Sequence, residues 1–166
     1  MKITPNAFRA LLLLGATAFL WIPTTVSAQA WDMNIPYNVK EGKIDWYSYS
    51  GFRRYHSDCH VCHGPNGMGS SYAPGLMDSI KTMSYPEFLA MVVAGRMNVG
   101  TADQNVMPSF ANNPNVMCYV EHIFSYLKAR AAGVLKPGRP RQKQRKPQIA
   151  KDYENACMNS DAWKDS

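Results

Sequence analysis

Several features are missing from this sequence of 166 residues, and each absence narrows what the chain can be. There is no internal repeat, which excludes a repeat architecture. No segment alternates apolar and polar residues clearly enough to indicate a strand, so the sequence predicts a small all-α domain. After Ile22, no apolar run reaches the roughly 20 residues that cross a bilayer, which excludes a membrane span in the rest of the chain.

Acidic side chains are absent from residues 1–30. Two basic residues occur early, a mostly apolar run of thirteen residues follows at 10–22, and small residues lead to Ala28 and Ala30. This order is typical of a secretory signal peptide, and the apolar run is too short for an uncleaved membrane anchor. We therefore expect cleavage after Ala28 or Ala30 and a periplasmic mature protein of about 136 residues, the size of one domain.

The excess of basic residues is confined to the end of the chain. Residues 31–133 carry eight basic and eight acidic side chains, whereas residues 134–166 carry eight basic and four acidic ones, a net charge of +4. Within the second part, segment 136–147 has six basic residues, three prolines and no acidic or apolar side chain. Such a composition cannot bury enough surface to order itself, so we expect a partly disordered basic arm over residues 134–148.

The sequence does not identify the binding partner of this basic arm. Basic tails often bind nucleic acid, but export excludes that partner. An acidic protein surface or an anionic membrane remains, as does an arm that contacts only solvent.

Two early segments have helical patterns. The first covers residues 43–63, and Gly51 inside it costs about 1 kcal/mol relative to alanine, which predicts that another helix crosses close to its backbone. The second covers residues 84–95, where Ser84 and Glu87 form a capping-box pattern and Gly95 can end the helix.

A third helix is predicted near the end of the domain. Asn113 and Pro114 mark its start, Gly133 ends it, and its apolar stripe consists of Val116, Val120, Ile123 and Leu127. Residues 96–113 between the second and third helices have no periodicity and are expected to form a loop.

Residues 59–63, Cys-His-Val-Cys-His, form the most specific motif in the sequence. The C-x-x-C-H spacing is that of covalent c-type haem attachment. On a helical turn, residues three apart lie on one side, so the thiols of Cys59 and Cys62 can both reach the vinyl groups along one haem edge. The imidazole of His63 then projects under the ring as the proximal iron ligand. We therefore predict one covalently attached haem c.

Zinc sites and redox dithiols also use closely spaced cysteines. A structural zinc site takes four protein ligands, and only Cys118 and Cys157 could complete one here, neither with a second ligand at short spacing. A redox dithiol would lie in a βαβ context, which the sequence does not indicate. Both alternatives are weaker interpretations than haem attachment.

The distal iron ligand has to come from another segment. A methionine sulfur is a soft ligand that suits an electron carrier, and Met107 is the favoured candidate because it lies in the predicted loop and precedes the stiffening Pro108. Met97 and Met83 are the alternatives, whereas Met117 lies on the helix stripe and is assigned to packing.

The remaining histidines are not predicted to be ligands. His60 lies inside the motif and points away from the iron on helical geometry. His56 and His122 lie on helices among polar neighbours and are predicted to be surface residues.

Two further cysteines lie outside the motif. In an exported protein we expect Cys118 and Cys157 to form a disulfide that tethers the C-terminal segment, residues 149–166. Closing such a loop of about 40 residues stabilises a fold by roughly 4 kcal/mol in the chain-entropy model. The alternative is two free thiols, or thiols paired with another molecule.

Four stretches, GFRRYHSDCHVCHGPNGMG, YAPGL, VMPSF and MCYVEHIFSYLKAR, resemble a class I cytochrome c in order and separation. The resemblance implies a single haem domain over residues 31–133, whose first and last helices cross at Gly51 and Tyr55 against Tyr126. It also implies that the Pro74 carbonyl accepts the second N–H of the proximal histidine and that Leu76 packs on the haem.

Residues 37–64 and 101–119 are similar to a subgroup, the four-cysteine, methanol-metabolism-related periplasmic cytochromes c. This resemblance implies an electron carrier, not an enzyme, which accepts electrons from a PQQ-dependent methanol dehydrogenase, especially the lanthanide-dependent type. Another cytochrome c or a terminal oxidase would be its acceptor. A general respiratory cytochrome c, or a haem sensor or peroxidase-like protein with a labile distal ligand, remains as an alternative.

Overall fold

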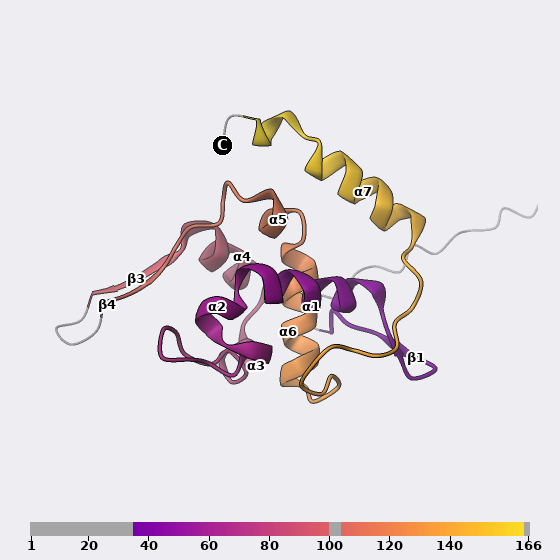
Figure 1. Cartoon of the computed structure of the whole chain (residues 1–166), viewed down its shortest axis with the longest axis horizontal. Helices are drawn as coiled ribbons and strands as arrows, with labels where there is room; N and C mark the ends of the chain where they lie inside the picture. Colours follow the sequence, from indigo (N-terminus) through magenta and orange to yellow (C-terminus); the bar gives the residue numbers. More distant parts are fainter. Residues whose placement is uncertain (1–34, 100–103, 165–166) are drawn as a thin grey trace, which may run out of the picture. The chain divides into compact units, whose positions relative to one another are not determined.

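The computed structural model describes residues 35–99 and 104–164, so the predicted signal peptide and its cleavage sites lie outside the described residues (Figure 1). The helices are α1 Trp46–Asp58, α2 His60–His63, α3 Ser79–Thr82, α4 Tyr85–Ala94, α5 Pro114–Met117, α6 Val120–Ala131 and α7 Gln148–Met158, with short 3-10 turns at Pro65–Gly67 and Asp161–Trp163. The strands are β1 Val39–Lys40, β2 Lys43–Ile44, β3 Arg96–Val99 and β4 Gln104–Met107. Among the described residues, no helix combines the length and apolar character needed to cross a membrane.

The predicted helical fold class is confirmed, but the expected absence of strands is wrong. Two antiparallel hairpins are present, β1 with β2 and β3 with β4. The β3–β4 hairpin replaces part of the loop expected over residues 96–113. Its paired apolar residues Met97 and Val106 are 71% and 63% exposed, so this pair adds no buried position to a strand pattern in the sequence.

The first predicted helix is shorter than expected and divided in two. The Asp45 carboxylate accepts a hydrogen bond from the Ser48 amide at 2.8 Å, and this cap starts α1 at Trp46 instead of at residue 43. At the other end α1 stops at Asp58, and α2 restarts the helix after Cys59. The predicted capping box of α4 is confirmed, since Ser84 and Glu87 exchange both hydrogen bonds and Gly95 ends the helix with φ 70°.

The crossing of α1 and α6 forms the centre of the core (Figure 1). A Cβ atom on Gly51 would lie 1.8 Å from the His122 carbonyl oxygen, so only glycine allows the two backbones to approach this closely. Tyr55 and Tyr126 are both fully buried, with ring centroids 5.5 Å apart. The predicted crossing at Gly51 and Tyr55 against Tyr126 is therefore confirmed.

The third predicted helix has the expected start and the expected buried face. The Asn113 side chain accepts from the Asn115 amide at 2.9 Å, and the predicted stripe is buried throughout, at Val116, Val120, Ile123 and Leu127. The helix is interrupted between α5 and α6, however, at Cys118 and Tyr119. Cys118 is 1% exposed and pairs with Cys157, so the interruption lies where the predicted disulfide joins α7 to the domain.

His122 is buried, and its prediction as a surface residue is wrong. It is 4% exposed, its Nδ1 lies 3.1 Å from the Ser50 hydroxyl, and its ring packs against the rings of Tyr47 and Tyr119. Burial, and then the nearby charge of Arg54, lowers the pKa of His122 to about 4. Glu121 and Ser125 are polar neighbours on the same helix, but α1 covers the face of α6 on which His122 lies.

Because His122 is buried, we expect the folded protein to lose unfolding free energy in acid. Because the pKa of His122 is lower in the folded protein than in the unfolded chain, protons bind preferentially to the unfolded chain between pH 6.5 and pH 4. We expect His122 to cost the haem-loaded protein roughly 2 to 3 kcal/mol of unfolding free energy between pH 7.5 and pH 4.5. Urea titrations at both pH values should show a correspondingly smaller acid loss in His122→Gln than in wild type.

A matched variant separates this effect from general acid sensitivity. Ser57→Ala replaces an exposed side chain of α1 that does not titrate, and its acid loss should match that of the wild type. An unchanged pH dependence in His122→Gln would show that another group is responsible.

The basic arm is extended, as predicted, but it is packed against the domain and not partly disordered. Its backbone forms two hydrogen bonds with Ile44. The Ile44 amide donates to the Gln142 carbonyl at 3.3 Å, and the Gln144 amide donates to the Ile44 carbonyl at 2.8 Å. Arg139 donates to the Tyr49 hydroxyl at 2.6 Å. At the far end, Lys146 pairs with Glu154 of α7. The arm is ordered by backbone bonds and aromatic contacts, which its own composition does not reveal.

Candidate haem site

Cys59, Cys62 and His63 lie at the junction of α1 and α2, two helices that are labelled in Figure 1. Cys59 follows the last residue of α1, and Cys62 and His63 form the end of α2. The amides of Cys62 and His63 both donate to the Cys59 carbonyl, at 3.2 and 3.0 Å, so a tight helical turn joins the three residues. Neither motif cysteine forms a disulfide within the described residues, and Cys62 is exposed.

The orientation of His63 is determined by a second residue. Its Nδ1 lies 3.0 Å from the Pro74 carbonyl oxygen. A carbonyl can only accept, so Nδ1 carries the proton and donates, which leaves the Nε2 lone pair available for a metal. The contact that the resemblance implied is therefore present. An imidazole held in this way is a more basic ligand with a defined ring plane.

The loop after the motif is folded back by its own backbone. The Gly69 amide donates to the His63 carbonyl at 2.7 Å, and the Leu76 amide donates to the Gly67 carbonyl at 2.8 Å. Gly64 has φ 72°, and a Cβ there would lie 2.1 Å from the Gly69 carbonyl oxygen. These contacts bring Pro74 back to His63 across eleven residues of chain.

One contributor to this arrangement was missed by sequence reasoning. The buried Tyr55 hydroxyl donates to the Gly64 carbonyl at 2.7 Å and so connects the core of α1 to the loop. Tyr55 was expected to contribute only to the helix crossing. No local pattern could reveal the second contact, because the partner is a backbone carbonyl whose position depends on the whole loop.

The cysteine chemistry does not fit a redox dithiol or a zinc site. Burial, with the nearby charge of Asp58, raises the pKa of the Cys59 thiol to about 12, whereas reactive and metal-binding cysteines need a stabilised thiolate. Across the described residues, no group of three or more histidine, cysteine or carboxylate side chains could hold a metal ion. The alternatives considered for the motif are thus disfavoured.

Met107 lies at the end of β4, not in an irregular loop as expected. Its side chain is half-buried and packs against the core. The strand end is held against α4, since a Cβ on Gly95 would lie 2.5 Å from the Met107 carbonyl oxygen and the Phe110 amide donates to the Val92 carbonyl at 3.0 Å. A sulfur ligand from this position would have a rigid backbone behind it.

The two alternative methionines are placed differently. Met97 is 71% exposed on the β3–β4 hairpin, paired in register with Val106. Met83 ends α3 and packs partly against the core. Solvent exposure makes Met97 the weaker candidate for a ligand in a dry haem crevice.

The residues around the motif fit a haem. The donor set combines two thiols on one helical turn, an imidazole whose Nε2 is free, and apolar side chains that a porphyrin could cover. Leu76 and Met77 pack partly against the core, and Val61 and Met68 are 68% and 65% exposed. A haem bound here would be held by Cys59 and Cys62, with His63 and Met107 as its predicted axial ligands.

Comparison with known proteins places the chain in a family, although no protein-family model matches it. It is 47% identical over 121 residues, 73% of its length, to cytochrome c-553I of Paracoccus denitrificans. It is 33% identical over 96 residues to cytochrome c-555 of Methylococcus capsulatus, a match that covers 57% of this chain and 72% of that relative. The first match spans only 54% of cytochrome c-553I, about half the length of that relative.

A solved structure is similar as well. The crystal structure of the c-type cytochrome XoxG from Methylobacterium extorquens AM1 matches with a TM-score of 0.66 and 49% sequence identity. The match covers 73% of this chain and 74% of that one. Together with the motif turn and the oriented histidine, these likenesses show that the chain belongs to the class I c-type cytochromes, electron-transfer proteins that carry covalently bound haem c.

Proposed function

We propose that this cytochrome carries single electrons in the periplasm from a PQQ-dependent methanol dehydrogenase of the lanthanide type to another cytochrome c or a terminal oxidase. The observation that carries the electron-transfer role is the hydrogen bond from His63 Nδ1 to the Pro74 carbonyl, which presents Nε2 as an axial ligand. The methanol link is supported by the resemblance of residues 37–64 and 101–119 to that subgroup and by the 49% identity to XoxG.

The roles of individual residues follow from this proposal. Cys59 and Cys62 form the thioethers, His63 is the proximal ligand and Met107 the distal one, while Leu76 packs on the ring. Haem supplies one-electron ferrous–ferric chemistry when bound. With both axial positions occupied by side chains, the protein would exclude substrate from the metal and pass only electrons, which accounts for its role as a carrier accessory to an alcohol dehydrogenase and not an enzyme.

Stopped-flow reduction tests the proposed donor. The mature haem-loaded protein should be reduced rapidly by a purified lanthanide-dependent methanol dehydrogenase in the presence of methanol, and slowly by a quinol-oxidising complex. The reverse order of rates would favour the alternative of a general respiratory cytochrome c. Periplasmic export is tested separately by the mass of the mature chain, whose first residue should be Gln29 or Trp31.

A further inference from the structure

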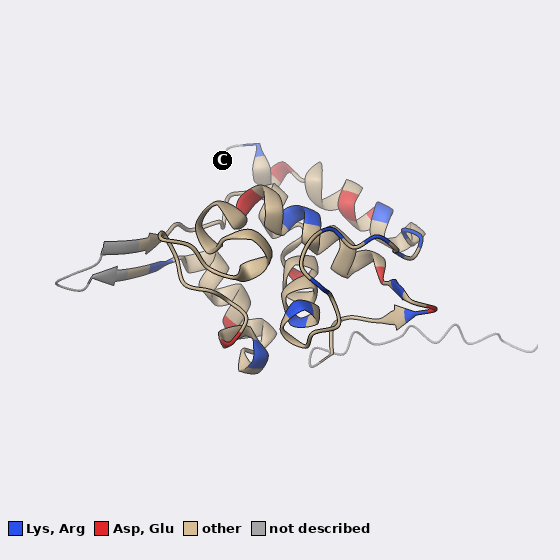
Figure 2. Ribbon diagram, turned by 60° about the horizontal axis from the view of Figure 1, so that its bottom comes forward, with Lys and Arg blue, Asp and Glu red and all other residues tan. Residues whose placement is uncertain are grey.

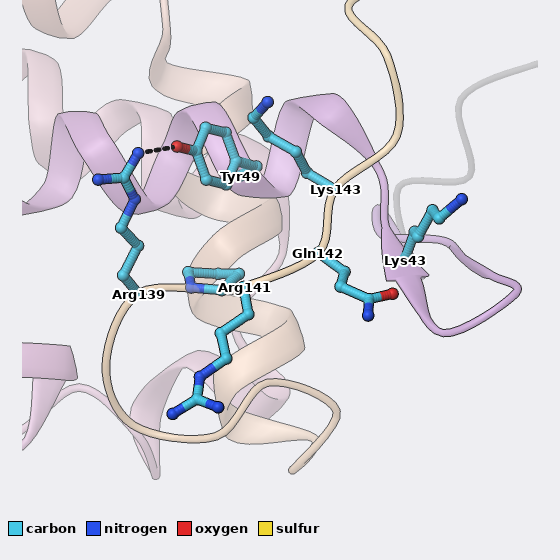
Figure 3. A pocket seen from close by; sticks show the side chains of 7 residues that line it. Lys43, Tyr49, Arg139, Arg141, Gln142 and Lys143 are labelled. Atoms are coloured by element: carbon cyan, nitrogen blue, oxygen red, sulfur yellow. Dashed lines mark hydrogen bonds between the residues drawn. The ribbon is translucent and has the colours of Figure 1, made fainter.

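The basic arm brings several lysine and arginine residues together with Lys43 from the start of the domain. Figure 2 colours the basic positions blue along the ribbon. Lys43, Arg139, Arg141 and Lys143 line a shallow depression of about 680 Å³ together with Tyr49 and Gln142 (Figure 3). All four cations are exposed, and we call these four residues the cationic face. Because the arm is hydrogen-bonded to Ile44, their spacing is set by the fold and not by a mobile tail.

The charge of the cationic face is not neutralised within the protein. None of its four residues forms an ion pair with a carboxylate in the described part of the chain. The buried carboxylate of Asp45, two residues after Lys43, is already engaged by Ser48 and by the Asn38 amide at 2.8 Å. Uncompensated charge on a concave surface raises the local potential and attracts an anionic partner.

Aromatic rings support two of the four cations. Arg139 donates to the Tyr49 hydroxyl, and the Lys143 ammonium lies 4.9 Å from the Tyr49 ring centroid and 5.6 Å from that of Trp46. Figure 3 shows these two side chains on either side of Tyr49, while Arg141 and Lys43 point away from it in different directions. Charges that spread in this way fit an extended acidic surface better than a single small anion.

The composition of the arm favours a protein partner over a membrane. Segments that lie on membranes combine basic residues with large apolar side chains that enter the lipid. Segment 136–147 contains no such side chain. Redox partner proteins, by contrast, bind each other through small interfaces, and electrostatic attraction between them raises the rate of association.

We propose that the cationic face is a docking surface for an acidic patch on the electron-donor protein, an inference that rests on the proposed function. The face is separate from the haem motif. Tyr49 lies in the first turn of α1 and Cys59 follows its last turn, which puts about 15 Å of helix between them. The face would therefore hold the partner at one end of α1 while electrons pass at the other.

The test compares two triple variants of the haem-loaded protein with equal changes in net charge. K43Q/R141Q/K143Q removes three of the four charges of the face and keeps the Arg139–Tyr49 contact. The control K81Q/K128Q/K164Q removes three cations elsewhere. At low ionic strength, the second-order rate constant for reduction by the methanol dehydrogenase should be about tenfold lower in the face variant than in the wild type. In the control variant it should fall by less than about twofold. The difference should vanish near 1 M salt, where the screening length is about 3 Å.

A second measurement does not depend on the proposed donor. Titration with poly-L-glutamate should show about tenfold weaker binding for the face variant and near-normal binding for the control. Equal losses in the two variants would overturn the proposal. A membrane-binding result would also overturn it. In that case the wild type would bind vesicles of equal phosphatidylglycerol and phosphatidylcholine, and the face variant would lose vesicle binding but still bind poly-L-glutamate. If the dehydrogenase does not reduce the wild type, the donor assignment fails, and the poly-L-glutamate titration still decides whether the face binds acidic chains.

Discussion

Replacing Gly51 by alanine should destabilise the haem-loaded protein by about 3 kcal/mol or more and lower its melting temperature by roughly 10 °C. The new Cβ would lie 1.8 Å from the His122 carbonyl oxygen and 2.4 Å from its carbon. Both atoms belong to the backbone of α6, so neither can rotate away, and the helices would have to separate. That separation would loosen the buried pair Tyr55 and Tyr126.

The intrinsic preference of alanine for helices works in the opposite direction. At an unconstrained helical position, replacing glycine by alanine stabilises by about 1 kcal/mol, so a loss in Gly51→Ala reports the steric contact alone. Ser57→Ala, at an exposed position on the same helix, is the control and should change the melting temperature by only a degree or two. Normal or raised stability in Gly51→Ala, measured by thermal and urea unfolding, would mean that the helices cross elsewhere.

Replacing Met107 by leucine should change the spectrum and the potential of the protein without releasing its haem. Leucine retains the apolar packing of Met107 against the core but removes the sulfur. Under the proposed ligand set, we expect loss of the absorption band characteristic of methionine bonded to ferric iron, a high-spin spectrum and ready binding of carbon monoxide. The reduction potential should fall by on the order of 0.1 V, because methionine ligation favours reduced iron.

Met97→Leu is the matched control, since it removes the same chemical group from the same hairpin. Met97 is largely exposed, and its substitution should leave the spectrum, the potential and carbon monoxide binding unchanged. If Met107→Leu retained the wild-type spectrum, another residue would be the distal ligand. If the wild type itself were high-spin and bound carbon monoxide readily, the sensor or peroxidase-like alternative would be favoured.

Much of the haem site could be predicted because its chemistry is local in sequence. The spacing of Cys59, Cys62 and His63 sets their geometry on one helical turn, and the caps at Ser84 and Asn113 likewise act within three residues. Gly51 revealed a long-range contact, but only because glycine inside a helix has a cost that needs an explanation. The disulfide between Cys118 and Cys157 was inferred from the expected compartment and is present in the structure.

The errors over His122 and the basic arm concern contacts between segments distant in sequence. The surface position predicted for His122 is wrong because its environment is determined by Ser50 and Tyr47 of α1. The basic arm lacks apolar side chains and is ordered instead by pairing with Ile44, about 100 residues earlier in the chain. The strands of the β3–β4 hairpin have four residues each, which is too short for a clear periodic signal, and the paired Met97 and Val106 are exposed.

The disulfide gives the four cysteines two incompatible oxidation requirements during maturation. Cys118 and Cys157, 39 residues apart, must be oxidised, whereas Cys59 and Cys62, as the proposed thioether residues, would have to stay reduced until haem is attached. Thiols three residues apart meet more often than thiols 39 apart, so an indiscriminate oxidant would first join the wrong pair. A host that produces the haem-loaded protein therefore needs an oxidant for Cys118 and Cys157 and a reductant for Cys59 and Cys62. The balance between the two should determine the yield of haem-loaded protein.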